Sequence, residues 1–172
     1  MIHIVKDGFF NYFDLIKNHF KSIPLYTQEE YKKFEQNVNW PGQRSLDLEE
    51  VSPFLNVLII HEINRHFEFL FKNDRYSVRS YLHLRLDNDN KDDWIHKDND
   101  TSDYTIMVYL SDTNLESGTS IYDENNNLIT DVKFVQNRAL LFDANYNHKS
   151  SKNFGQNKDN GRLTLNVFMK RR

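Results

Sequence analysis

The 172-residue sequence contains no cysteine. Without thiols the chain can form neither a disulfide framework nor a thiolate nucleophile, and it can hold neither a zinc ribbon nor a cysteine-ligated iron–sulfur cluster. Any metal would have to be bound by histidine, carboxylate or neutral oxygen, which the seven histidines allow. The chain has the size of one domain and can bury about 70% of its unfolded surface, so it needs no crosslink in order to fold.

The sequence also lacks a strong excess of one charge and any long apolar segment. Its net charge is −3 and its isoelectric point is near 6.2, so no strong field favours nucleic acid or an anionic membrane. No stretch approaches the roughly 18 apolar residues of a transmembrane helix, and the first residues lack the pattern of a signal peptide. We therefore expect a soluble, cytoplasmic protein with no membrane partner.

Asparagine, by contrast, is abundant and clusters in segments such as NDNKDD, DENNN and GQNKDN. Such clusters are typical of loops. The same bias is typical of an AT-rich genome, and on this ground we hypothesise that the protein is phage-encoded and expressed in the host.

Residues 1–75 have the apolar spacing of helices. The pattern predicts a helix over about residues 7–22, a short helix from Thr27 to about Val38, and a long buried helix over 53–72 with Pro53 in its first turn. The segment 40–50 is typical of a loop. We expect these helices to form a support for the remainder of the chain.

From residue 76 the pattern changes to short strands. Alternating β-branched and aromatic residues predict strands at 77–86, 104–111, 118–123, 129–135, 138–144 and 162–170, within a total of about eight. Polar loops are expected around 87–103 and 151–161. The pattern predicts a single α+β domain over 1–172, with a helical part (1–75) and a mainly β core (76–172) folded as an antiparallel sandwich or barrel.

Two histidines and an aspartate form the strongest candidate site. His96 and Asp98 are two residues apart in WIHKDND, so they would face the same way on a strand. His148 follows the predicted strand 138–144, and Arg162 lies 14 residues beyond it. Two histidines and one carboxylate on one face of a metal leave three positions open, enough for a bidentate 2-oxo acid and dioxygen. A buried arginine would suit the far carboxylate of that acid.

This arrangement resembles the 2-oxoglutarate/Fe(II)-dependent dioxygenase superfamily, and its prolyl-4-hydroxylase-like branch in particular. The resemblance covers roughly residues 78–169. It rests on His96-Lys97-Asp98, His148, Arg162 with Thr164, Tyr109-Leu110-Ser111-Asp112, Ser117-Gly118-Thr119 and the apolar run ALLFDANYNH.

The resemblance implies a double-stranded β-helix (jelly roll) with N-terminal supporting helices. It implies that His96, Asp98 and His148 ligate Fe(II) and form the catalytic centre, and that the co-substrate 2-oxoglutarate is bound by Arg162, Thr164 and Tyr109. Dioxygen would be the second co-substrate, and ascorbate an optional further factor. Four residues that share faces of two strands are candidates for the substrate pocket: Tyr81, His83, Arg85 and Asn166.

The function that the resemblance implies is hydroxylation of a peptidyl (prolyl-like) or small-molecule substrate, coupled to decarboxylation of 2-oxoglutarate. The carboxylate of Asp98 favours hydroxylation, because family members that halogenate lack it. The acidic surroundings of the motif disfavour a nucleic acid substrate. Two alternatives remain open: a metal-binding cupin-like jelly roll without oxygenase activity, which does not need Arg162, and a structural jelly-roll domain in which the triad is accidental. The oligomeric state is left open.

Overall fold

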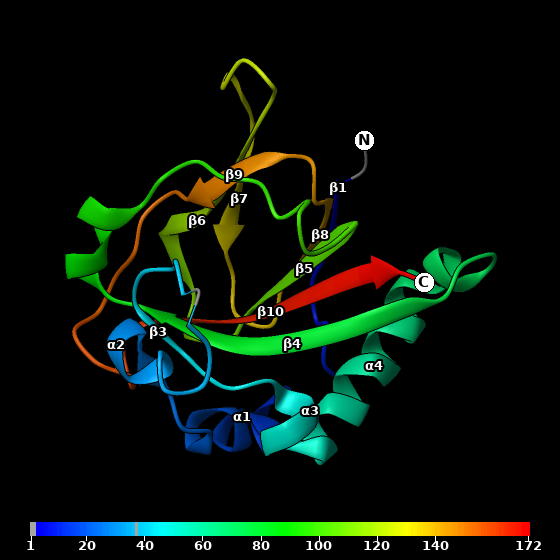
Figure 1. Ribbon diagram of the computed structural model, residues 1–172, viewed down its shortest axis with the longest axis horizontal. Coiled ribbons are helices and arrows are strands. Elements are labelled where there is room, and N and C mark those ends of the chain that lie inside the picture. Colours follow the sequence, from blue (N-terminus) through cyan, green and yellow to red (C-terminus); the bar gives the residue numbers. More distant parts are fainter. Residues whose placement is uncertain (1–2, 37) are drawn as a thin grey trace.

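The computed structural model describes residues 3–36 and 38–172, except for the side chains of residues 90–92. This part of the chain is mainly β and forms two antiparallel sheets (Figure 1). The larger sheet has the order β1-β8-β5-β10-β4-β3-β2, and the smaller has the order β7-β6-β9. The strands of the larger sheet are β1 (His3–Lys6), β2 (Tyr26–Thr27), β3 (Gln43–Arg44), β4 (Tyr76–Arg85), β5 (Tyr104–Tyr109), β8 (Ala139–Asp143) and β10 (Arg162–Arg171). Those of the smaller sheet are β6 (Asn114–Tyr122), β7 (Leu128–Phe134) and β9 (Asn147–Ser150).

Helices α1 (Phe13–Ser22), α3 (Leu48–Val51) and α4 (Pro53–Phe67) cover the outer face of the larger sheet, away from the smaller sheet (Figure 1). Helix α2 (Gln28–Tyr31) lies beside β2 and β3 at the edge of that sheet. Two 3₁₀ turns span Glu68–Phe71 and Asp87–Asp92. Pro53 opens α4, where its missing N–H costs nothing. Leu55, Ile59, Ile63 and Phe67 follow at intervals of four and are all buried, so this stripe of α4 packs on the sheet.

Alternation along the central strands divides the larger sheet into two faces. Leu163 and Leu165 of β10 point to the helical core, whereas Arg162 and Thr164 point to the other side. On that inner face, side chains of β5 and β8 pack against β6 and β7 in a second core, formed by Met107, Tyr109, Leu140, Phe142, Ile121, Val132, Phe134 and Tyr146. The two sheets therefore pack face to face through this second core. The part of the inner face that β4 and β10 form lies outside it.

The mainly β class and the order of helices before the long strands agree with the sequence-based prediction. The predicted helices, however, were longer than those in the structure. The helix expected at 7–22 begins only at Phe13, because Gly8 and Tyr12 adopt positive φ angles of 64° and 53°. The helix expected to reach about Val38 ends at Tyr31, and the one expected to reach residue 72 ends at Phe67 before a 3₁₀ turn.

Four strands have no counterpart in the prediction: β1, β2, β3 and β9. Each has two to four residues, too few to show an alternating pattern, and each is held by hydrogen bonds to a strand far away in the sequence. The first 75 residues therefore contribute three strands to the larger sheet in addition to helices, and the expected loop at 40–50 contains β3 and most of α3. None of the helices in residues 3–36 and 38–172 combines the length and the apolar character needed to span a bilayer.

Candidate metal centre

Backbone pairing brings the three candidate metal ligands together. His96 and His148 exchange two backbone hydrogen bonds, of 3.1 Å and 2.9 Å, in an isolated antiparallel bridge. The N–H of Asp98 donates to the carbonyl of Ala144, just after β8, at 3.1 Å. The expectation that His96 and Asp98 share a strand was wrong, because only a single bridge forms there. The two side chains converge nonetheless, since this segment is hydrogen-bonded to β9 and to the end of β8.

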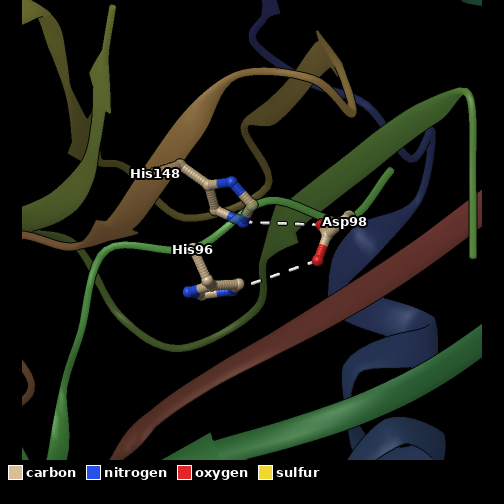
Figure 2. A group of neighbouring side chains, drawn as sticks. All are labelled: His96, Asp98 and His148. Carbon is tan, nitrogen blue, oxygen red and sulfur yellow. Dashed lines mark ion pairs between the residues drawn. The ribbon is translucent and has the colours of Figure 1, made fainter. Parts of the chain in front are cut away.

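The side chains of His96, Asp98 and His148 point toward one another (Figure 2). One potential ligand atom of each residue lies within 4.8 Å of the other two. Nε2 of His148 is 3.4 Å from Oδ2 of Asp98, and Nε2 of His96 is 3.9 Å from Oδ1. Neighbouring ligands of an octahedral ion with bonds of about 2.1 Å lie about 3 Å apart, so small side-chain movements would bring all three onto one ion. His148 is buried, whereas the side chain of His96 is 42% exposed, so the group opens on the His96 side.

Hydrogen bonds fix the ring nitrogens that face the centre. Nδ1 of His96 lies 3.1 Å from the carbonyl oxygen of Trp94, and Nδ1 of His148 lies 3.1 Å from that of Tyr146. Because a carbonyl only accepts, each Nδ1 carries the proton and each Nε2 keeps its lone pair for a metal. Burial lowers the pKa of His148, which favours this neutral form.

Asp98 is oriented by a further hydrogen bond. The Thr105 hydroxyl, in β5, donates to Oδ2 of Asp98 at 2.8 Å. Such a bond to a ligating carboxylate holds it in position for a metal. Thr105 is a residue that the sequence analysis missed, since nothing in its surroundings distinguishes it from other threonines in strands.

The candidate ligands open into a cavity of about 660 Å³. Five of the other residues predicted for the site also line it: Arg162, Tyr81, His83, Arg85 and Asn166. The β4–β10 register explains why, because it pairs Arg85 with Arg162, His83 with Thr164 and Tyr81 with Asn166 on the inner face.

Arg162 is the most unusual residue in this cavity. It begins β10 and is only 2% exposed. Its Nη2 donates to the carbonyl of Gly118 at 3.1 Å and to Oγ1 of Thr119 at 3.4 Å, while its Nε has no partner. No carboxylate among the side chains that the structure describes forms an ion pair with it. Burial lowers the pKa of Arg162 to about 10, so it remains a cation at neutral pH. A buried cation without a counterion is costly unless a ligand compensates it.

The two other residues predicted to bind 2-oxoglutarate do not line the cavity. The Thr164 hydroxyl donates to the backbone carbonyl of His83 at 3.3 Å. The Tyr109 hydroxyl lies 2.9 Å from Oγ1 of Thr119 and 3.1 Å from the carbonyl oxygen of Val132. Both side chains are fully buried. Tyr109 shares Thr119 with Arg162, whose guanidinium also lies 5.9 Å from the centre of the Tyr109 ring. The co-substrate contacts expected of Tyr109 and Thr164 stay predictions.

The candidate substrate residues differ in how far their polar groups are satisfied. Arg85 donates to Oδ1 of Asp93 at 2.7 Å, so its charge is neutralised. His83 donates from Nε2 to the carbonyl oxygen of Pro41 at 2.7 Å. Burial, reinforced by neighbouring arginines, holds the pKa of His83 well below 6.5, so it is neutral. The amide of Asn166 forms no hydrogen bond with any described side chain, and its Oδ1 is buried.

Arg44 and Trp40 also line the cavity, although the sequence analysis did not select them. They lie in or beside β3, in the segment expected to be a loop. A two-residue strand has no periodic signal, so its inward-facing side chain could not be recognised from the sequence.

Scanning family models finds no match to this sequence, and comparison with curated proteins finds none either. The fold, however, is similar to solved structures. HygX from Streptomyces hygroscopicus, solved with nickel and 2-oxoglutarate bound, has a TM-score of 0.67 at 13% identity, over 98% of this chain and 82% of HygX. An oxidoreductase of the 2OG-Fe(II) oxygenase family from Burkholderia pseudomallei has a TM-score of 0.64 at 13% identity, over 98% and 84% of the two chains. A prolyl-4-hydroxylase from Pseudomonas putida has a TM-score of 0.60 at 15% identity, over 99% and 92%. The chain therefore has the fold of the 2OG-Fe(II) oxygenases, prolyl 4-hydroxylases among them.

Proposed function

We propose that the protein is a 2-oxoglutarate- and Fe(II)-dependent oxygenase with a double-stranded β-helix core. One observation carries the proposal: Arg162, which is buried and forms no ion pair with a described side chain, lies in the same cavity as His96, Asp98 and His148. The triad alone would suit many metal proteins, whereas a buried cation facing the same cavity also demands an anion. A dicarboxylic 2-oxo acid satisfies both, since one end chelates a metal and the other pairs with arginine.

The charges of this arrangement balance. Two neutral imidazoles and the carboxylate of Asp98 would leave one positive charge on a bound Fe(II). Arg162 adds a second, and the two carboxylates of 2-oxoglutarate cancel both. Bound Fe(II) would supply the activation of dioxygen, coupled to oxidative decarboxylation of 2-oxoglutarate to succinate. The chain's part is to hold the metal on three sides, orient the co-substrate through Arg162 and exclude bulk water from the buried side of His148.

Hydroxylation of a C–H bond is the outcome that we propose, because the carboxylate of Asp98 leaves no ligand position vacant for a halide. The substrate would be a small molecule or a peptidyl group. The prolyl-4-hydroxylase with a similar fold supports the peptidyl part of this range. Dioxygen would be consumed, and ascorbate could serve as an auxiliary reductant.

The proposal is tested by adding Fe(II) and 2-oxoglutarate to the metal-free protein under anaerobic conditions. We expect a visible metal-to-ligand charge-transfer band that saturates with 2-oxoglutarate. Asp98→Ala should remove the band, while Asp123→Ala, at an exposed turn outside the cavity, should leave it intact. Circular dichroism would check that both variants are folded.

Other outcomes would identify the alternative functions. If Fe(II) binds but 2-oxoglutarate changes neither the spectrum nor the stability, the protein is a cupin-like metal protein without oxygenase activity. If the folded protein takes up no divalent metal, measured by elemental analysis after dialysis, a structural role for the domain replaces the proposal.

A further inference from the structure

The cavity contains another arginine, Arg44, that forms no ion pair with a described side chain. Strand β3 pairs with β4, which places Arg44 opposite His83 on the inner face of the larger sheet. Its guanidinium lies 4.0 Å from the centre of the Tyr81 ring, 5.4 Å from that of Phe168 and 5.8 Å from that of Trp40. These rings confine the guanidinium, and all four side chains line the cavity.

Stacking satisfies only the faces of a guanidinium and leaves its N–H edges available. Arg44 forms neither an ion pair nor a hydrogen bond with any side chain that the structure describes, and its Nε is buried without a partner. The carboxylate of Asp98 has a coulombic interaction with Arg44, but this carboxylate belongs to the candidate metal centre. The donors of Arg44 therefore lack an acceptor among the residues that the structure describes.

The charge around the cavity is opposite to that of the whole chain. Of the residues that line it, seven are lysine or arginine and four are aspartate or glutamate, a balance of +3. The chain as a whole carries −3. Arg85 is paired with Asp93, and Arg162 is assigned to 2-oxoglutarate above. Arg44, which is half-buried and has a fully buried Nε, still has no counterion among the described side chains.

A second polar group without a partner lies close to Arg44. Asn166 is opposite Tyr81 in the β4–β10 register and two residues before Phe168, so it lies beside two of the rings that surround Arg44. Its Oδ1 is buried and unpartnered. The wall of the cavity near the metal centre thus offers a planar cation, an amide and three aromatic rings.

We propose that the substrate is a small molecule that carries a carboxylate, and that Arg44 binds this carboxylate while Asn166 makes a second polar contact. This inference rests on the proposed oxygenase function and narrows its substrate class. A carboxylate matches the flat fork of one arginine, and the aromatic rings suit an apolar body. A cavity of about 660 Å³ must hold both 2-oxoglutarate and substrate, which favours a small acid over a peptide. An internal peptidyl residue has no charge to offer Arg44.

The test compares matched acids and amides. The Fe(II)-loaded protein is incubated with 2-oxoglutarate, dioxygen and a panel of free amino acids and simple organic acids, each beside its carboxamide. A proline-rich peptide with blocked ends and a set of phosphate monoesters complete the panel. Substrate-dependent succinate formation is the readout. We expect at least one acid to stimulate turnover, with its amide at least about 10-fold weaker in kcat/KM.

Variants of Arg44 then separate substrate binding from co-substrate binding. Arg44→Met should raise KM for the acid about 10- to 100-fold with little change in kcat, and Arg44→Lys, which keeps the charge but loses the fork, should be intermediate. Neither should change the affinity for 2-oxoglutarate, read from the charge-transfer band. Lys170→Met, on the exposed rim of the same cavity, is the matched control and should leave KM nearly unchanged.

The inference is overturned if a carboxamide, the blocked peptide or a phosphate monoester stimulates turnover as well as any acid, if no compound of the panel does so, or if Arg44→Met retains its KM. Calorimetric titration of the same acids into the metal-free protein distinguishes this failure from that of the proposed function. If the charge-transfer band is absent but acids still bind the wild type and not Arg44→Met, the oxygenase proposal fails while Arg44 remains an acid-binding residue.

Discussion

At the scale of single residues, buried polar groups without partners mark the candidate site. Arg162 and Arg44 each have a buried nitrogen that forms no hydrogen bond, and Asn166 has a buried oxygen in the same state. All three line one cavity. Most buried polar groups in folded proteins are hydrogen-bonded, so this concentration indicates a place that is completed by ligands.

Arg162→Met is expected to stabilise the ligand-free protein while it abolishes 2-oxoglutarate binding. Methionine removes an uncompensated buried charge and fills similar space, so the free energy of unfolding should rise by about 1–2 kcal/mol. Urea titration at neutral pH would measure it, and the charge-transfer band would report co-substrate binding. A variant that loses stability and still binds 2-oxoglutarate would show that Arg162 has a structural role instead.

Because His83 is buried, we expect the free energy of unfolding to decrease in mild acid. Burial, with Arg85, Arg44 and Arg162 nearby, holds the folded-state pKa of His83 well below 6.5. The unfolded chain then binds the proton more readily, so the stabilising effect is complete above pH 6.5 and decreases as the pH falls below it. As the pH falls below 6.5, the free energy of unfolding should decrease by up to about 1.4 kcal/mol per pH unit for this residue.

The check is urea unfolding across this pH range for the wild type and for His83→Gln, which can still donate to the carbonyl of Pro41. His148, whose pKa burial also lowers, contributes with the same sign and is present in both proteins. A variant with the same slope as the wild type would assign the pH dependence to other groups.

At the scale of elements, the site depends on how β6 lies against β7. The pairing of these strands shifts between Asn114 and Gly118, and a Cβ on Gly118 would overlap the carbonyl oxygen of Val132. Glycine at such an irregularity allows a close approach of two backbones. The same residue's carbonyl accepts from Arg162 at 3.1 Å, so the irregularity also positions the candidate co-substrate arginine.

Gly118→Ala should therefore lower both stability and 2-oxoglutarate affinity. Overpacking at a tight contact costs about 1–3 kcal/mol, and a displaced β6 would withdraw an acceptor from Arg162. Thermal unfolding and the charge-transfer titration measure the two effects. Glu116→Ala, at an exposed residue of the same strand that forms an ion pair with Lys152, should change stability by no more than about 0.5 kcal/mol.

The elements that the sequence predicted well are the ones with enough length to show a pattern. Helix α4 displays its buried stripe over four turns, and β4 and β10 alternate over ten residues each. Strands β1, β2, β3 and β9 form because a partner strand offers unpaired backbone groups, and nothing local distinguishes them from loops. The missed Arg44 and the mistaken strand at His96 both follow from this limit, since each lies in such a short pairing.

At the scale of the whole molecule, the segment around β1 and Phe10 connects the helices to the larger sheet. Strand β1 pairs with β8, and the backbone of Phe10 exchanges hydrogen bonds of 2.8 Å and 2.9 Å with the side chain of Asn137. Arg65 and His66 of α4 both contact the carbonyl oxygen of Phe9 at 2.8 Å. The first residues, α4 and the strand region near residue 137 are thus joined in one network.

Because this network joins the helices to the sheet, we expect a single cooperative unfolding transition. Phe9 is fully buried in the core shared by the helices and the larger sheet, so Phe9→Ala should cost about 3–5 kcal/mol. Far-ultraviolet circular dichroism and the fluorescence of Trp40 and Trp94, which lie at the cavity, should lose their signals together in both proteins. Two separate transitions would divide the helical part from the β core and contradict the single-domain prediction.

The residue pattern was enough to predict the mainly β class, the long elements and a candidate metal site. With no cysteine, any metal ligands had to come from side chains such as His96, Asp98 and His148, and the resemblance added a dicarboxylic partner for Arg162. The tertiary structure was needed to see that Arg162 is buried with no counterion among the described side chains, that Tyr109 and Thr164 do not line the cavity, and that Arg44 does. Periodicity reports which face of an element is apolar, whereas ion pairing and access depend on strands that meet across long stretches of sequence.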